Sequence, residues 1–129
     1  MLTNDILQYD KVYKSKELIY TEYHGGCLYT HKYSYLLLFS NNGLMKIGQH
    51  WDYQDLKSVL LRLKAKPYKE DCFYQLDESE IKFILNDHEI EQIFNGKVME
   101  NKIVGSYVNL LSPEVEVFEL ISEKLLLNP

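Results

Sequence analysis

The residues that could take part in chemistry are few and scattered. The chain has four histidines, His24, His31, His50 and His88, and two cysteines, Cys27 and Cys72. No two histidines have the spacing that places ligands on one helix face, and no cysteine stands at ligand spacing from a histidine. A nucleophile-elbow serine and a glycine-rich phosphate loop are also missing. The sequence therefore predicts a protein that is not an enzyme, with no catalytic residues, no metal site and no cofactor.

Both cysteines are expected to be reduced thiols in the core, because neither lies in a paired motif and neither has basic neighbours that lower a thiol pKa. Residues 1–8 lack the basic region and apolar core of a secretion signal. The longest apolar run, Tyr35–Phe39, is far shorter than the roughly 20 residues of a membrane-spanning helix. We therefore expect a cytoplasmic protein with no membrane partner.

Charge is distributed unevenly along the chain. Residues 1–69 carry six acidic and ten basic side chains, a balance of +4, whereas residues 70–129 carry thirteen acidic and four basic ones, a balance of −9. An acidic half repels nucleic acid and attracts a basic partner, although the same charges could simply form a solubilising face. If a partner binds there, the expected patch comprises Glu78, Glu80, Glu89, Glu91 and Glu114.

The elements that must position these residues are mostly strands. A length of 129 residues suits a single domain, residues 1–129, and eleven tyrosines favour a pleated, half-buried sheet. The predicted elements of the first half are a weak strand at Ile6–Tyr13, a strand at Glu17–His24, a hairpin of Tyr29–Ser40 with Leu44–Gly48, and one helix near residues 52–64. Asp52 is the expected N-cap of that helix.

The second half reads as an antiparallel meander between Cys72 and Ile121. Its predicted strands are Cys72–Leu76, Ile81–Leu85, Glu89–Met99, Lys102–Leu111 and Glu114–Ile121, separated by short turns. A turn at Asn86–Asp87 pairs Phe83 with Ile90, and a turn at Glu100–Asn101 pairs Phe94 with Tyr107 and Gly96 with Gly105. The glycine pair marks a place where the sheet can bend sharply. We expect about eight strands in all, in an up-and-down order.

One side of this meander is apolar and forms the predicted interior. Its walls are Phe83, Phe94, Tyr107 and Phe118, and a polar row of Gln92, Asn109 and Glu116 crosses them if Ser112–Pro113 is a tight turn. Such a row indicates a hydrated pocket with polar anchors. One additional loop residue would instead turn Glu116 outward and bring Val115 and Val117 inward. The second arrangement is favoured, since glutamate is seldom buried.

The strand, turn, strand rhythm of Phe94-Asn95-Gly96-Lys97-Val98-Met99-Glu100-Asn101-Lys102-Ile103-Val104-Gly105-Ser106-Tyr107 resembles small bacterial lipocalin-like β-barrels. Counting the whole meander, the resemblance covers residues 72–121. It implies a barrel or half-barrel, with the helix of residues 52–64 available to plug one end. The chain departs from that family in lacking a Gly-x-Trp element near the N-terminus, a secretion signal and a disulfide.

Two functions follow as hypotheses. In the first, the barrel interior binds a small apolar or amphipathic ligand between the seven wall and anchor residues. In the second, the chain is an inhibitor or immunity-type interaction module whose acidic face binds a basic protein. An aromatic surface suited to protein contacts could also form from Tyr20, Tyr23, Tyr29, Tyr33 and Tyr35, although such residues are more often half-buried strand positions. An open barrel would also expose sheet edges through which a homodimer could form.

Overall fold

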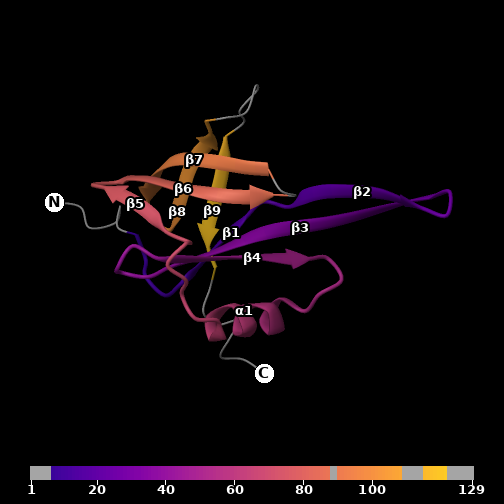
Figure 1. The fold of residues 1–129 in the computed structure, drawn as a ribbon, viewed down its shortest axis with the longest axis horizontal. Helices are drawn as coiled ribbons and strands as arrows, with labels where there is room; N and C mark the ends of the chain where they lie inside the picture. The colour runs from indigo at the N-terminus through magenta and orange to yellow at the C-terminus, as the bar shows by residue number, and fades with distance from the viewer. Residues whose placement is uncertain (1–6, 88–89, 109–114, 122–129) are drawn as a thin grey trace.

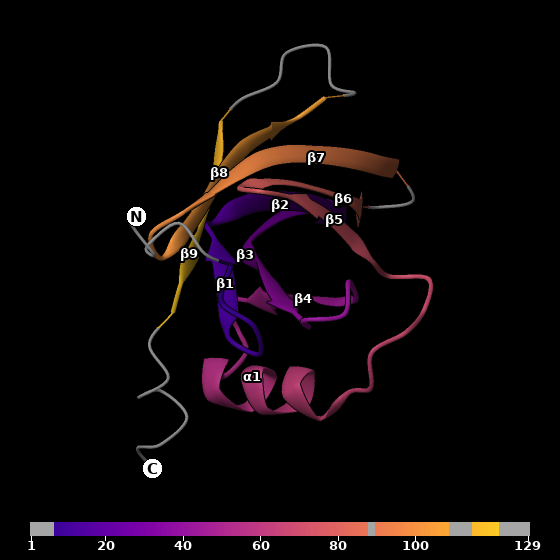
Figure 2. The same cartoon turned by 90° about the vertical axis from the view of Figure 1, so that its left-hand side faces the viewer.

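The computed structural model describes residues 7–87, 90–108 and 115–121. Its elements, in chain order, are β1 (Val12–Ser15), β2 (Leu18–His24), β3 (Cys27–Phe39), β4 (Met45–Trp51), α1 (Leu56–Ala65), β5 (Tyr74–Asp77), β6 (Glu80–Asp87), β7 (Ile90–Met99), β8 (Lys102–Tyr107) and β9 (Glu116–Leu120). The nine strands form one curved antiparallel sheet that does not close (Figures 1 and 2). The predicted fold class, a mainly β half-barrel with one inserted helix, is confirmed.

Strand β1 connects the two halves of the chain, because it pairs with β3 on one side and with β9 on the other. Along the sheet the order is β2-β3-β1-β9-β8-β7-β6-β5, and β4 pairs with the other side of β3. The segment β5 to β9 is the predicted meander, while β1 lies between β3 and β9. At the far ends of the sheet, a single bridge joins Leu44 to Phe73. The N–H of Met45 donates to the Cys72 carbonyl at 3.0 Å, so the sheet curls back towards itself without forming a full ladder.

Strand β3 is buried on both faces where it crosses the body. Tyr35, Leu37 and Phe39 point into the half-barrel and belong to the main core, together with rings from β6, β7 and β9. Leu36 and Leu38 point the opposite way and form a second core with Val59, Leu60 and Leu63 of α1. This explains why the sequence is continuously apolar from Tyr35 to Phe39, since no position of that run faces water.

Helix α1 covers the outer face of β3 and β4 (Figure 2), so the expectation that it plugs one end of the barrel is wrong. It begins later than predicted, because Asp55 and not Asp52 is the N-cap. The Asp55 carboxylate accepts hydrogen bonds from the backbone N–H of Ser58 at 3.1 Å and from its hydroxyl at 2.8 Å. In the described part of the chain, no helix combines the length and apolarity needed to cross a membrane.

The meander keeps its predicted faces but not all of its pairs. Strands β7 and β8 pair as predicted, with Phe94 opposite Tyr107 and Gly96 opposite Gly105. Strands β6 and β7 extend past the predicted Asn86–Asp87 turn, so Phe83 lies opposite Phe94 and not opposite Ile90. Because the register moves by an even number of residues, Phe83 and Phe94 still face the interior.

The pair of glycines makes room for the ring of Phe94. A Cβ at Gly105 would overlap the Asn95 carbonyl oxygen and the Cα of Gly96, and it would approach the Phe94 ring within 2.8 Å. A Cβ at Gly96 would also lie 2.8 Å from the Val104 carbonyl oxygen. Three of these neighbours, the Asn95 and Val104 carbonyl oxygens and the Cα of Gly96, are backbone atoms, which cannot move aside without distorting the ladder.

Replacing Gly105 by alanine should therefore destabilise the fold by about 2–3 kcal/mol, through overpacking against backbone. The matched control is Gly48→Ala, whose Cβ would meet only the flexible Leu63 side chain at 3.2 Å. That control should change the free energy of unfolding by less than about 1 kcal/mol. Urea unfolding of both variants measures the difference, and equal losses would contradict this account of the glycine pair.

Candidate functional site

The structure brings the four predicted aromatic walls together around Phe94. The Phe83 ring stacks on the Phe94 ring at a centroid distance of 4.9 Å, and the rings of Phe118 and Tyr107 meet it edge-on at 5.2 Å and 5.6 Å. Phe83, Phe94 and Phe118 are at most 2% exposed. The walls thus pack against one another, and a ligand among them would have to displace rings. Their role in ligand binding stays a prediction.

The predicted polar row is not formed as expected. Glu116 is buried, at 8% exposure, and Val115 is 65% exposed, so the favoured outward orientation of Glu116 is wrong. The alternative, with Glu116 and Phe118 facing inward, has the correct faces but the wrong pairs. Glu116 lies opposite Gly105, and Phe118 lies opposite Ile103. Ser112–Pro113, the site of the predicted tight turn, lies outside the described residues.

Of the two remaining anchors, Gln92 is half-buried opposite Leu85, and Asn109 lies outside the described residues. Glu116 lies opposite Gly105, and Gly105 lies opposite Gly96, which is four positions along β7 from Gln92, about 13 Å of extended strand. Glu116 therefore lies beside the glycine pair and not in a row with Gln92.

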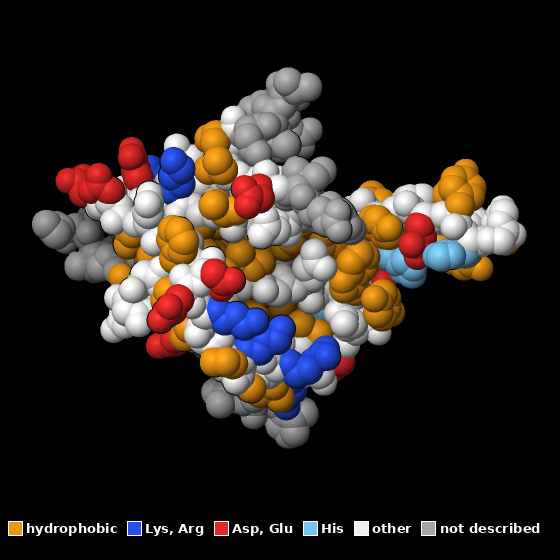
Figure 3. Space-filling model, in the orientation of Figure 1, with side chains coloured by type: hydrophobic (Ala, Val, Ile, Leu, Met, Phe, Trp, Pro, Cys, Tyr) orange, Lys and Arg blue, Asp and Glu red, His pale blue; other side chains and the backbone are white. Residues whose placement is uncertain are grey.

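Two of the larger hollows lie elsewhere, along β4. One, of about 360 Å³, is lined by Met45, Lys46, Ile47, Leu63, Lys66, Pro67, Lys69 and Cys72. The other, of about 380 Å³, is lined by Ile47, Asp71, Cys72, Phe73, Ile84, Asn86 and Glu91. Figure 3 shows lysine and arginine side chains gathered on this face, over α1. None of the six predicted ligand-binding residues that the structure describes lines either hollow.

The most conspicuous feature of the molecule is a two-stranded arm, which we define as residues 18–32. It consists of β2, the Gly25–Gly26 turn and the first part of β3, and it projects away from the half-barrel (Figure 1). Its exposed apolar side chains include Ile19 at 69%, Tyr23 at 74% and Leu28 at 56%. An isolated hairpin is only marginally stable in water, so the arm depends on side-chain packing at its base.

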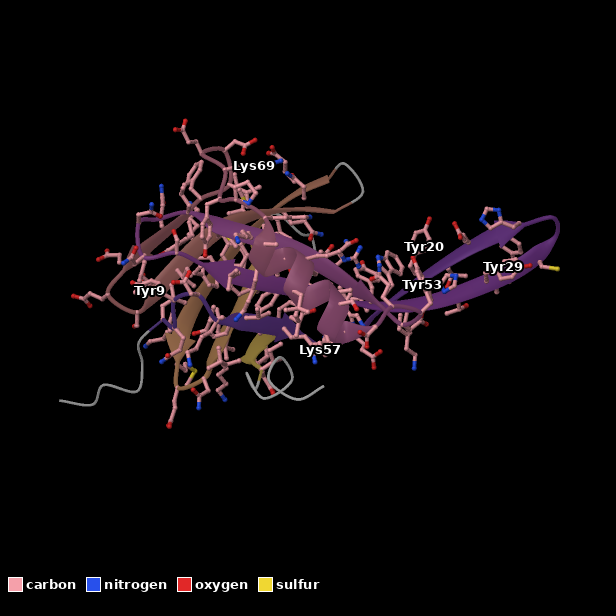
Figure 4. The ribbon with its side chains drawn as sticks, turned by 90° about the horizontal axis from the view of Figure 1, so that it is seen from below. Tyr9, Tyr20, Tyr29, Tyr53, Lys57 and Lys69 are labelled. Atoms are coloured by element: carbon pink, nitrogen blue, oxygen red, sulfur yellow. The ribbon has the colours of Figure 1, made fainter. Side chains whose placement is uncertain are left out.

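That packing comes from an aromatic platform on the inner face of the arm, formed by Tyr20, His31, Trp51 and Tyr53. Trp51 stacks on the buried Tyr33 ring at 4.7 Å and on the Tyr53 ring at 6.2 Å, and it meets Tyr20 edge-on at 5.9 Å. His31 lies 5.6 Å from Tyr53. In Figure 4, Tyr20 and Tyr53 are both at the base of the arm, while Tyr29 lies nearer its tip. The platform continues the aromatic core outward to solvent.

Two carboxylates flank the aromatic platform. Asp52 accepts a hydrogen bond from the Lys32 backbone N–H at 3.1 Å, and its other oxygen lies 3.5 Å from His31 Nδ1. The Lys32 N–H and the neighbouring His31 hold the pKa of Asp52 below its ordinary value. Glu22 accepts from the Tyr20 hydroxyl at 3.5 Å and lies 3.1 Å from His24 Nε2. The platform therefore combines aromatic faces with negative charge.

Sequence reasoning identified this surface only in part. Of the five tyrosines proposed as an aromatic surface, Tyr33 and Tyr35 are buried, Tyr23 lies on the outer face of the arm, and Tyr20 and Tyr29 lie on its inner face. Tyr53 was missed because it was assigned to the helix, which begins three residues later, at Leu56. Cys27 is exposed on the arm, so its assignment as a core thiol is wrong. Cys72 is half-buried, and burial raises its thiol pKa.

A buried lysine side chain, Lys46 of β4, links the sheet to α1. Lys46 Nζ donates to the carbonyls of Leu63 and Lys64 at the C-terminal end of α1, at 3.2 Å and 3.0 Å, and lies 4.5 Å from the centre of the Tyr68 ring. The Tyr68 hydroxyl donates to Asp10 at 3.0 Å. Positive charge is favourable at a helix C-terminus. Desolvation lowers the pKa of Lys46, which means that burying the charged ammonium group costs free energy. The contact between Lys46 and the end of α1 is therefore a structural one.

Among the described residues, no group of three or more His, Cys, Asp or Glu side chains is arranged to hold a metal ion. Comparisons with protein-family models, with curated proteins and with solved structures find no match to this chain. The resemblance to lipocalin-like barrels therefore stays a prediction.

The alkaline stability of the protein should depend on two phenols, the half-buried Tyr68 and the buried Tyr74. Desolvation, assisted by Asp10, raises the pKa of Tyr68 to about 12, and desolvation raises that of Tyr74, which donates to the Ser40 carbonyl, to about 12 as well. The folded state then holds these protons more tightly than the unfolded state. The free energy of unfolding is consequently undiminished below pH 10 and falls as the pH rises towards 12.

Guanidinium unfolding across that pH range measures the effect. The double variant Tyr68→Phe, Tyr74→Phe should lose less stability over the range than the unmodified chain, and the exposed control Tyr23→Phe should lose as much. The lowered pKa of Lys46 has the opposite effect, because the unfolded state holds that proton more tightly. The resulting gain in stability is complete by pH 10.5, the ordinary pKa of lysine. A free energy of unfolding that stays constant above pH 10.5 would contradict the role given to Tyr68 and Tyr74.

Proposed function

We propose that this chain is a protein-binding module that holds a basic segment of a partner protein on the aromatic platform of its arm. The observation that carries the proposal is the combination of exposed rings with two carboxylates, Glu22 and Asp52, on one face. Aromatic faces attract lysine and arginine, and tyrosine and tryptophan are enriched at protein interfaces. The platform offers both interactions to the same cation.

The exposure of the platform supports the same proposal. Tyr53 of the platform is 69% exposed, and Tyr29, on the same face of the arm but nearer its tip, is 46% exposed. Rigid rings offer large contact areas at little cost in conformational entropy, and Trp51 is already held in place by the buried Tyr33 ring beneath it. A partner would therefore meet a largely preorganised surface.

This location differs from the acidic half expected from the charge distribution. Glu80 lies opposite Lys97 near one end of β6, whereas Glu91 lies opposite Asn86 near the other end. Glu78 precedes β6, next to Glu80, while Glu89 and Glu114 lie outside the described residues. The described members are thus separated by most of the length of β6, about 20 Å. A basic partner is better matched at the aromatic platform, where Asp52 lies beside His31 and Glu22 beside Tyr20.

The chain offers a built-in reporter for the test, because Trp51 is its single tryptophan. An arginine-glycine peptide should change Trp51 fluorescence in a saturable, salt-sensitive way, and the same peptide with glutamine in place of arginine should not. Tyr53→Ala should weaken binding by about two- to thirtyfold, the range that cation–π contacts contribute.

Tyr23→Ala is the matched control, because Tyr23 belongs to the same arm but lies on its outer face. It should leave the affinity for the arginine peptide unchanged. Equal binding of the arginine and glutamine peptides, or an unchanged affinity in Tyr53→Ala, would contradict the proposal.

The interior of the half-barrel remains a second candidate, for a small apolar or amphipathic ligand. Its support is the clustering of the predicted walls beside the buried carboxyl group of Glu116. If this proposal holds, a fatty acid should raise the melting temperature of the chain, and Phe94→Ala should alter its affinity. Phe94→Ala should also cost about 3–5 kcal/mol of stability, so binding is compared below the melting temperature of the variant. A fatty acid that leaves the unmodified chain unaffected would contradict this second proposal.

A further inference from the structure

The outer edge of β2 is an open strand edge without the usual protection. Among the described strands, β2 pairs with β3 alone, and its sequence, Leu-Ile-Tyr-Thr-Glu-Tyr-His, has no proline or lysine. Natural edge strands commonly carry such residues, which prevent pairing with another chain. Beside the arm, Asp52 accepts the Lys32 N–H and the Gln54 side chain accepts the Trp51 N–H, so these two backbone donors are not available to a second chain.

The turn at the tip of the arm determines which backbone groups reach this edge. Gly25 and Gly26 have φ of +58° and +81°, as in a two-residue hairpin turn, and they pair His24 with Cys27. The two residues that flank such a turn, here His24 and Cys27, each donate a hydrogen bond to the other. The backbone N–H and C=O groups of alternate residues along β2 point away from β3. Ile19, Thr21 and Tyr23 therefore direct their N–H and C=O groups to the open edge.

We propose that two copies of this chain pair antiparallel through β2, around a two-fold axis at Thr21. This register aligns all seven residues of the strand. Ile19 then lies opposite Tyr23 of the second copy on the outer face, where both side chains are otherwise exposed. On the inner face Tyr20 lies opposite Glu22 of the second copy. No like charges are opposed, and the three outward-directed residues form a regular ladder.

A second copy is the occupant that this edge fits best, because the match follows from the symmetry of the strand itself. The two exposed apolar residues, Ile19 and Tyr23, stand at equal distances from its central residue, Thr21. A two-fold contact requires such self-complementarity. The two arms would form a continuous four-stranded sheet, with both aromatic platforms on the same side. The inference uses the edge of the arm and not its inner face, so it does not depend on the proposed function.

The test uses the residue on the axis. Thr21→Lys and Thr21→Glu each oppose two like charges and should weaken the dimer by about tenfold or more, as sedimentation velocity over a concentration series would show. An equimolar mixture of the two variants opposes unlike charges and should form dimers again. Thr30→Lys is the matched control, because Thr30 lies opposite Thr21 on the same face of the arm but on β3, away from the proposed contact.

Three outcomes would overturn the proposal. They are a monomeric unmodified chain at every concentration, an equal effect of Thr30→Lys, and failure of the mixture to restore the dimer when Trp51 fluorescence shows both variants folded. Arginine-peptide binding by the Thr21 variants provides a separate readout. It should persist when the dimer is lost, so a failure of the dimer is distinguishable from a failure of the aromatic platform.

Discussion

The double burial of β3 is the constraint on which the rest of the structure depends. From Tyr35 to Phe39 this strand supplies alternate side chains to two different cores, one inside the half-barrel and one beneath α1. It also pairs with β1, β2 and β4, and through β1 it connects to the meander. A polar residue on either face of this run would disrupt one of the two cores, which explains why the strand is apolar at every position from Tyr35 to Phe39.

The same strand extends beyond its cores and becomes the arm. Between Cys27 and Lys32, no described helix covers the outer face of β3 and no described sheet covers its inner face, so the side chains there are largely exposed. The inner face remains ordered because Trp51 bridges the buried Tyr33 to the exposed Tyr53. The proposed binding surface is thus an extension of the core into solvent, which gives it rigidity without a separate scaffold.

The meander shows how far local patterns could predict the fold. Alternation placed Phe83, Phe94 and Tyr107 on one face correctly, because side chains in a strand alternate with a period of two and an even shift of register preserves the face. Pairing depends on loop length, which alternation does not report, so Phe83 was paired with the wrong residue and Glu116 was assigned to the wrong face. Asp52 was a plausible helix cap by type, yet it instead covers the open edge of β3.

By itself, the sequence determined the class of the fold, the meander, the Gly96–Gly105 pair and the apolar faces of the strands, since these depend on short-range periodicity and turn chemistry. Only the tertiary structure decided that β1 separates β3 from β9, that α1 lies outside the sheet, and that Tyr20, His31, Trp51 and Tyr53 share one surface. These contacts join residues that are distant in the chain. They are stabilised by side-chain packing, which short-range sequence patterns do not predict.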